Sequence, residues 1–249
     1  VQGIAGVMSI TGTAQTAPLR VGYPLGDTIG GMTAAFAVAA ALNAKPRGTF
    51  LDISMTEAVL STMGWVVSNH LVGGITPAAN GNENPTSAPS GTFGTADQPI
   101  NIAANKDDQW VILTDVLGCA GLRERPEFAT REDRKANRDM LRAALEERLM
   151  QKPAAHWVDV LNAKGVPCGP VLTVPQILRS EQVRGRDLIA SVDTGKETLQ
   201  LAASPVRMDG ARPHPDRPPP ELGADTNDVL GGLGLTAAEI ETLRAEGVI

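Results

Sequence analysis

The first strong pattern in the chain is an Ala-rich stretch in which apolar residues recur at intervals of three and four. It covers residues 28–43 and ends before the turn sequence KPRG at residues 45–48. This period predicts a helix. Because the stretch is apolar on nearly every side, we expect most of its surface to be buried.

A strand and a second helix are expected next. Residues 49–54 (TFLDIS) alternate in the manner of a short strand. Residues 55–71 predict a helix that Ser54 caps, with Glu57 at the third position completing a capping box. A helix, a strand and a helix in succession indicate α/β construction.

The chain then changes character, and residues 73–98 are dense in Gly, Pro, Asn and Thr. Such a long segment is a linker between domains or a functional loop. Beyond it, residues 97–180 predict a small, mainly helical α+β unit. Within it we expect a strand at 100–103 and helices at 107–118, 131–150 and 154–164, the second with Leu141, Leu145 and Leu149 on one stripe.

The last part of the chain predicts strands within residues 183–203 and an extended proline-rich segment at 212–220. Two helices are expected after it, at 225–233 and 236–246, and Thr236 with Glu239 caps the second.

Composition narrows the function classes. The formal net charge of −6 and the 3% of aromatic residues speak against nucleic-acid binding, which uses basic surfaces and stacking rings. Two cysteines are too few for a disulfide framework and indicate a cytoplasmic protein. We expect no apolar run near the roughly 20 residues that span a bilayer, and hence no membrane partner.

Motifs for common catalytic chemistries are absent from the sequence. His70, His156 and His214 form no closely spaced ligand pair, so no metal site is expected. The sequence has no GxGxxG fingerprint, no phosphate-binding lysine loop and no GxSxG elbow. Nucleotide-dependent and serine-hydrolase chemistry are therefore not indicated.

The remaining candidate is Asp27, at the start of the Ala-rich helix. A carboxylate there receives backbone N–H groups and the positive end of the helix dipole, which favour its ionised form. Gly30 and Gly31 follow it and leave room for a ligand near the backbone. Local sequence leaves two interpretations open: Asp27 is a nucleophile, or it only caps the helix.

Several segments, taken in order, resemble the family III CoA-transferases, the formyl-CoA and carnitine-CoA transferase group. The resemblance covers essentially the whole chain. Its landmarks are residues 2–12 (QGIAGVMSITG), 18–32 (PLRVGYPLGDTIGGM), 51–55 (LDISM), 80–85 (NGNENP), 88–93 (APSGTF), 95–97 (TAD), 165–171 (GVPCGPV), 218–223 (PPPELG) and 246–249 (EGVI).

The resemblance implies an α/β fold made of the C-terminal portion of a Rossmann-like large domain and a small α+β domain. Residues 1–72 and 181–249 would belong to the large domain, 73–96 would be a linker and active-site loop, and 97–180 would be the small domain. The chain opens without Met in structured-looking sequence, so we expect it to lack an N-terminal part. Relatives form interlocked homodimers, and a homodimer or the missing N-terminal half is the expected partner.

The resemblance also implies an activity: CoA moves from an acyl-CoA donor to a carboxylic acid through aspartyl-anhydride and aspartyl-CoA intermediates. Asp27 occupies the position of the family nucleophile. Gly30 and Gly31 would give backbone access, and Met55 would form an apolar wall beside the thioester. Coenzyme A is then a substrate, and no permanently bound cofactor is expected.

Two alternatives stay open at this point. One is a 2-methylacyl-CoA racemase-like isomerase, which would pair the same aspartate with a histidine. The other is a catalytically silent relative that keeps the fold. The loop at residues 73–94 lacks the run of consecutive glycines of the formyl-CoA type, so formyl-CoA is not the expected substrate.

Overall fold

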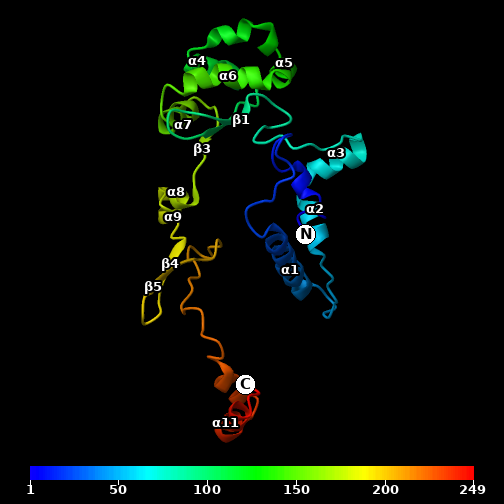
Figure 1. Cartoon of the computed structure of the whole chain (residues 1–249), viewed down its shortest axis with the longest axis vertical. Coiled ribbons are helices and arrows are strands. Elements are labelled where there is room, and N and C mark those ends of the chain that lie inside the picture. The colour runs from blue at the N-terminus through cyan, green and yellow to red at the C-terminus, as the bar shows by residue number, and fades with distance from the viewer. The chain divides into compact units, whose positions relative to one another are not determined.

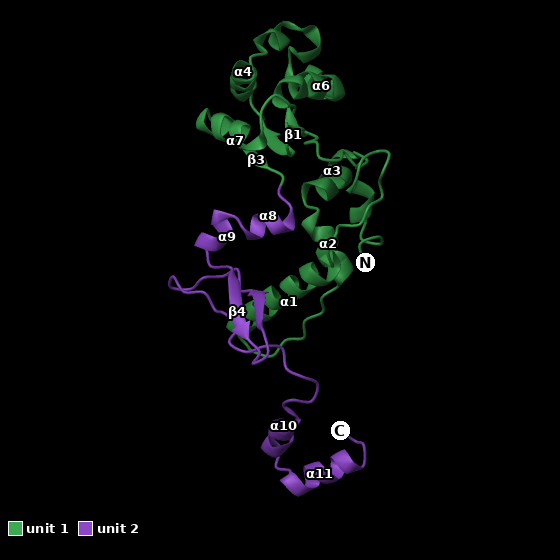
Figure 2. Cartoon of the chain, turned by 60° about the vertical axis from the view of Figure 1, so that its left-hand side comes forward, with its two compact units in different colours: residues 1–171 green, residues 172–249 purple.

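The computed structural model describes residues 1–249 as two compact units, Val1–Val171 and Leu172–Ile249 (Figure 2). Figure 1 shows the chain coloured from its N-terminus to its C-terminus, with most helices and strands labelled. The division falls between Val171 and Leu172, whereas the sequence placed a boundary after residue 180. The four-part domain organisation stays a prediction.

The first unit begins with a short 3-10 helix and three α-helices. These are η1 (Val7–Ile10), α1 (Leu25–Asn43), α2 (Met55–Thr62) and α3 (Trp65–Gly73). The predicted cap of α2 is confirmed, because the Ser54 hydroxyl accepts a hydrogen bond from the Glu57 amide at 3.3 Å. The single helix expected at 55–71 is wrong, because Gly64 has φ 47° and ψ −111° and interrupts it.

The strand expected at residues 49–54 is also wrong: the segment has no regular structure. An extended segment becomes a strand only when a neighbour completes its hydrogen-bonded ladder, and no strand pairs with residues 49–54. The alternating pattern therefore predicted a strand without the partner that a sheet requires.

Helix α1 is far more exposed than its sequence suggested. Only Gly26 and Gly30 are buried on it, while Met32, Phe36 and Leu42 are 66%, 78% and 64% exposed. The prediction that α1 is buried on most sides is wrong for this chain. Its main packing partner within this chain is α2.

The length of α1 also bears on the expectation that no apolar segment is long enough to span a bilayer. It has 19 residues and a mean hydropathy of 1.4 over its most apolar window, so by length and composition it is able to cross a membrane. The expectation that no apolar run reaches this length was wrong. Core helices of soluble proteins and signal sequences pass the same test.

A three-stranded antiparallel sheet forms the centre of the rest of this unit. Its strands, β1 (Ser90–Phe93), β2 (Ile100–Ala103) and β3 (Cys168–Pro170), lie in the order β1-β2-β3. Strand β2 is confirmed at its predicted bounds. Strands β1 and β3 were not predicted, because four and three residues are too short for a periodic pattern.

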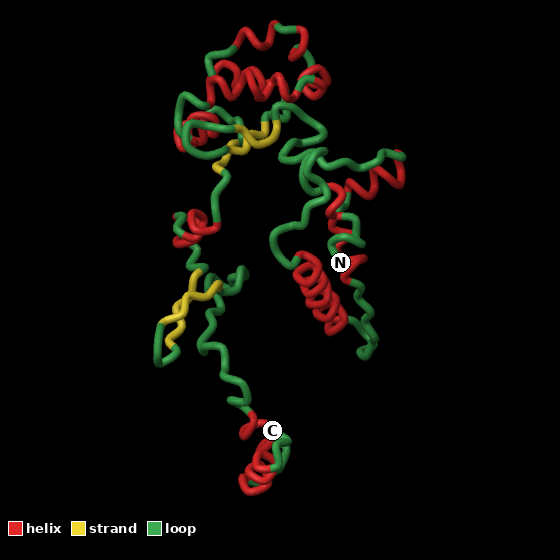
Figure 3. The backbone as a smooth tube through the Cα atoms, in the orientation of Figure 1, coloured by secondary structure: helices red, strands yellow, loops and turns green.

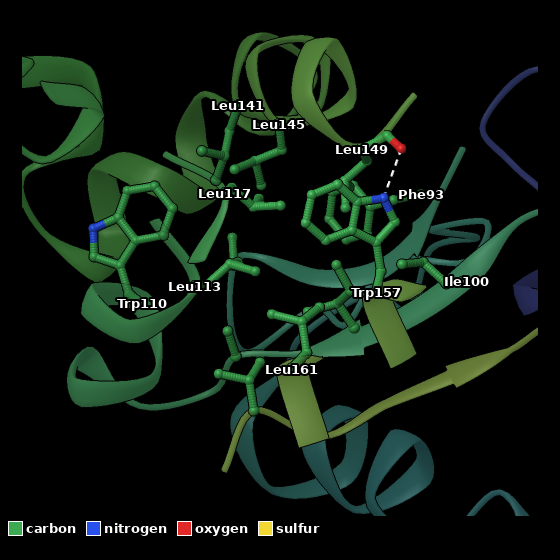
Figure 4. Packing of buried hydrophobic residues seen from close by; sticks show 14 of the residues in the cluster. Phe93, Ile100, Trp110, Leu113, Leu117, Leu141, Leu145, Leu149, Trp157 and Leu161 are labelled. Atoms are coloured by element: carbon green, nitrogen blue, oxygen red, sulfur yellow. Dashed lines mark hydrogen bonds between the residues drawn. The ribbon is translucent and has the colours of Figure 1, made fainter. Parts of the chain in front are cut away.

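Helices pack on the sheet face that carries Phe93, Ile100 and Ile102 and enclose the main core (Figure 4). They are α4 (Asp107–Val116), α6 (Arg138–Leu149) and α7 (Ala154–Ala163), with the 3-10 turns η2 (Ala120–Glu124) and η3 (Pro126–Phe128). Helix α5 (Arg131–Ala136) packs against η3 and α6. The stripe of Leu141, Leu145 and Leu149 is confirmed, since all three side chains are fully buried. Residues 131–150 form two helices, because the backbone of Asn137 leaves the helical conformation.

The second unit is built from a hairpin and four short helices, separated by loops (Figure 3). Its elements are α8 (Val174–Leu178), α9 (Glu181–Gly185), the antiparallel strands β4 (Ile189–Asp193) and β5 (Thr198–Ala202), α10 (Thr226–Gly232) and α11 (Ala237–Ala245). The capping box of Thr236 and Glu239 is confirmed at the start of α11. The proline-rich residues 212–220 contain no helix or strand.

Candidate functional site

Asp27 lies in the first turn of α1, and its side chain is exposed. The helix begins at Leu25, so Asp27 is the third helical residue and Pro24 is the N-cap. No side chain caps this helix end, so the interpretation of Asp27 as a cap is wrong. The carboxylate stands near the positive end of the helix dipole with no protein hydrogen bond.

The segment before α1 is held in place by Gln2, which is only 8% exposed. Its Oε1 accepts from the Val21 amide at 2.9 Å, and its Nε2 donates to the Tyr23 carbonyl at 3.1 Å. These bonds fix the chain that leads into α1, and thus the position of Asp27. Gln2 entered the sequence prediction only as the first residue of the landmark at residues 2–12, and its hydrogen bonds to residues 21 and 23 were not predicted.

Gly30 and Met55 lie in direct contact where α1 packs on α2. A Cβ on Gly30 would come within 2.8 Å of Met55 Cγ. The absence of a side chain at Gly30 therefore makes room for Met55, which is itself 43% exposed. Gly31 is different, because a Cβ there would meet no atom within 4 Å. The structure thus brings Gly30 and Met55 together and leaves Gly31 open, while their roles toward a substrate stay predictions.

The loop after α3 is tied to the N-terminal segment. The Gly81 amide donates to the Gly12 carbonyl at 2.6 Å. Two hollows border this loop. One, of about 520 Å³, is lined by residues 13–15, 79–83, 92–94, Pro99, Asp139 and Arg142. The other, of about 690 Å³, is lined by residues 81–84, parts of the three strands, Asn162 and Pro167. Asp27 lines neither hollow, and within this chain it stands at an open surface.

The two cysteine thiols and the metal-binding side chains are the other groups that could carry chemistry. Burial raises the pKa of the Cys168 thiol to about 11 and also raises the pKa of Cys119. Both thiols are therefore protonated at neutral pH and are weak nucleophiles. No group of three or more His, Cys, Asp or Glu side chains is placed to hold a metal ion. Asp27, whose side chain is exposed, stays the candidate nucleophile.

Comparison with known proteins shows which family the sequence matches. The sequence model of CoA-transferase family III matches residues 1–226. The chain belongs to this family. An acetyl-CoA:oxalate CoA-transferase of Acetobacter aceti is 35% identical over 222 residues, which cover 88% of this chain and 56% of that protein. A succinyl-CoA:mesaconate CoA-transferase of Haloarcula marismortui is 29% identical, over 94% of this chain and 60% of its own length.

A solved structure agrees with the family assignment. A CAIB/BAIF family protein from Brucella suis matches 93% of this chain and 61% of its own chain, with a TM-score of 0.81 and 28% identity. Its likeness supports the predicted α/β fold class. This family III chain spans about 60% of the length of the relatives it matches.

Proposed function

We propose that this family III chain takes part in CoA transfer from an acyl-CoA donor to a carboxylic acid, with Asp27 as nucleophile. The observation that carries the proposal is the unpaired, exposed carboxylate of Asp27 in the first turn of α1. The family resemblance assigns the nucleophile to this residue. The relatives reported above are named CoA-transferases, which favours transfer over a racemase or a silent relative.

The first half of the reaction loads CoA onto the protein. An Asp27 oxygen attacks the thioester carbonyl carbon of the donor, the C–S bond breaks, and CoA leaves as a thiolate. The thiolate then attacks the Asp27 carbonyl carbon of the mixed anhydride. The C–O bond breaks, the donor acid leaves as its carboxylate, and Asp27 carries CoA as a thioester.

The second half reverses these steps with the acceptor. The acceptor carboxylate attacks the Asp27 thioester, releases the CoA thiolate and forms a new anhydride. The thiolate attacks the acceptor carbonyl carbon of that anhydride, which yields acceptor-CoA and restores the Asp27 carboxylate. Each step exchanges one activated acyl group for another, so the cycle balances without an external energy source.

The acceptor that we propose is a small dicarboxylic acid. Oxalate, mesaconate and glutarate occur in the names of the relatives, and acetyl-CoA and succinyl-CoA are their named donors. A screen of these two donors against these three acids would identify the pair that forms acceptor-CoA fastest. A monocarboxylic acid series of matched length serves as the control.

The test of the proposed function compares Asp27→Ala with Asp52→Asn. Asp52 is an exposed acid near the start of α2, in a segment without regular structure. We expect CoA exchange to be lost in Asp27→Ala and kept in Asp52→Asn. Retained exchange in Asp27→Ala contradicts the assignment. Exchange of the α-proton in deuterium oxide without acid exchange would indicate the isomerase instead.

We further propose a cytoplasmic setting and a homodimer or a larger assembly. The support for the setting is that Cys119 and Cys168 form no disulfide. The support for the assembly is the row of exposed apolar side chains on α1. Gel filtration with mass detection tests the second point, and a stable monomer of 26.0 kDa would contradict it.

A further inference from the structure

Three arginines of α5 and α6 hold the chain segment that precedes and forms β1. The guanidinium of Arg134, which is buried, donates to the Ala88 carbonyl at 3.0 Å. Arg138 donates to the Asn84 carbonyl at 2.6 Å and to the Ser87 carbonyl at 3.1 Å. Arg142 donates to the Thr92 carbonyl and lies over the Phe93 ring, 5.0 Å from its centroid. Hydrogen bonds from these arginines therefore hold residues 84–93 against α5 and α6.

Glu83 is the acidic side chain that meets two of these arginines. It pairs with Arg138 at 3.2 Å and also with Arg142, and its side chain is only 20% exposed. A Cβ on Gly91 would come within 2.8 Å of Glu83 Oε2 and 2.9 Å of the Asn82 carbonyl oxygen. The carboxylate is thus held by charge on one side and by the backbone of β1 on the other. Partial burial strengthens such a pair relative to an exposed one.

The turn that contains Glu83 also reaches the N-terminal segment. The Glu83 amide donates to the Asn80 carbonyl at 3.1 Å, which closes the turn around Gly81. The Gly81 amide then donates to the Gly12 carbonyl at 2.6 Å, and the Leu19 amide donates to the Thr11 carbonyl at 3.1 Å. Two residues after Leu19, the Val21 amide donates to the Gln2 side chain, which holds the segment leading into α1.

These contacts form a connected path from α6 to the helix that carries Asp27. We propose that Glu83 is a positioning residue: it fixes the Gly81 turn against Gly12 and so holds the segment that places Asp27. This inference rests on the proposed function of Asp27. Glu83 touches no reacting atom and acts only through the turn.

The experiment compares Glu83→Gln with Glu132→Gln in the full chain. Glu132 makes an ion pair with Lys135 on α5 and is 76% exposed, so it is a matched control with little energetic weight. Two quantities are measured: the hydrogen exchange of the Gly81 amide, and the rate at which hydroxylamine captures acylated Asp27 over a range of acyl-CoA concentrations.

In Glu83→Gln we expect faster exchange at Gly81 and a maximal capture rate about tenfold lower, with the half-saturating acyl-CoA concentration unchanged. Glu132→Gln should match the parent chain in both measurements. A lower maximal capture rate at an unchanged half-saturating concentration indicates a positioning role. A general loss of folded protein would instead lower the amount of Asp27 that is captured and leave the rate constant of capture unchanged.

A second variant guards against misfolding of the first. Gly91→Ala keeps the charge of Glu83 but places a Cβ against its carboxylate and against the Asn82 carbonyl oxygen. It therefore displaces both the carboxylate and the turn, and it should lower the capture rate in the same way. Normal capture rates in both Glu83→Gln and Gly91→Ala would overturn the positioning role. If the parent chain itself captures no hydroxylamine, the proposed function fails and this inference fails with it, while Gly81 exchange still reports whether Glu83 fixes the turn.

Discussion

Met55 packs directly against the backbone of Gly30, and a side chain at Gly30 would collide with Met55 Cγ at 2.8 Å. This contact joins α1 to α2 immediately after Asp27. Gly31, the next residue, has open space around it. The two neighbouring glycines therefore predict opposite outcomes for the same substitution.

Gly30→Ala should lower the free energy of unfolding by about 1–3 kcal/mol, because the added methyl group overpacks the contact. Gly31→Ala should raise it by up to about 1 kcal/mol, since alanine is the better helix former and meets no obstacle. Urea unfolding measures both. Adding Met55→Ala to Gly30→Ala should recover part of the loss, and equal stability of the two alanine variants would contradict the packing described.

Gln2→Ala should loosen the segment that leads into α1. The substitution removes the acceptor of the Val21 amide and the donor to the Tyr23 carbonyl. We expect a loss of about 1–3 kcal/mol and faster hydrogen exchange at Val21. Gln15→Ala, at an exposed position, is the control and should leave both quantities unchanged.

Leu145→Ala should be among the most destabilising changes, since Leu145 is fully buried on the leucine stripe of α6. Loss of this side chain leaves a cavity and costs about 2–5 kcal/mol. Met140→Ala on the same helix, where the side chain is exposed, should change stability by less than about 0.5 kcal/mol. Thermal and denaturant unfolding of the two variants distinguish core from surface.

Cys168 should make stability depend on alkaline pH. Burial raises its pKa from an ordinary value of 9.0 to about 11 in the folded chain. Between these values the unfolded chain loses the thiol proton and the folded chain keeps it, so stability falls as pH rises from about 9 to about 11. Cys168→Ala should show a shallower decline over this interval; an identical decline would contradict the burial of the thiol.

The sequence predicted both α6 and α1 as helices, but it predicted the buried face of α6 only. The leucine stripe of α6 has a polar opposite face, so its period identified both the helix and its buried side. Helix α1 is apolar all round, which identifies a helix but no particular face, and its exposure depends on what else covers it. The caps at Ser54 and Thr236 were predictable because a side-chain cap joins residues only three positions apart. Thr236 and Glu239 form the full capping box, whereas at Ser54 only the serine hydroxyl takes part.

Features made by pairing distant segments were not predictable. Strands β1 and β3 owe their conformation to β2, and their own sequences are too short to show a period. Asp27 was found from its place beside two glycines and from the family resemblance. The support from Gln2 became visible only when residues 2 and 21 were seen to be bonded.

The central claim is that the Asp27 carboxylate becomes acylated. The most direct measurement is peptide mapping by mass spectrometry after the chain is incubated with acetyl-CoA or succinyl-CoA and hydroxylamine. We expect a hydroxamate on Asp27 that requires acyl-CoA and is absent from Asp52 and Glu57. An unmodified Asp27 in protein that nonetheless transfers CoA would contradict it.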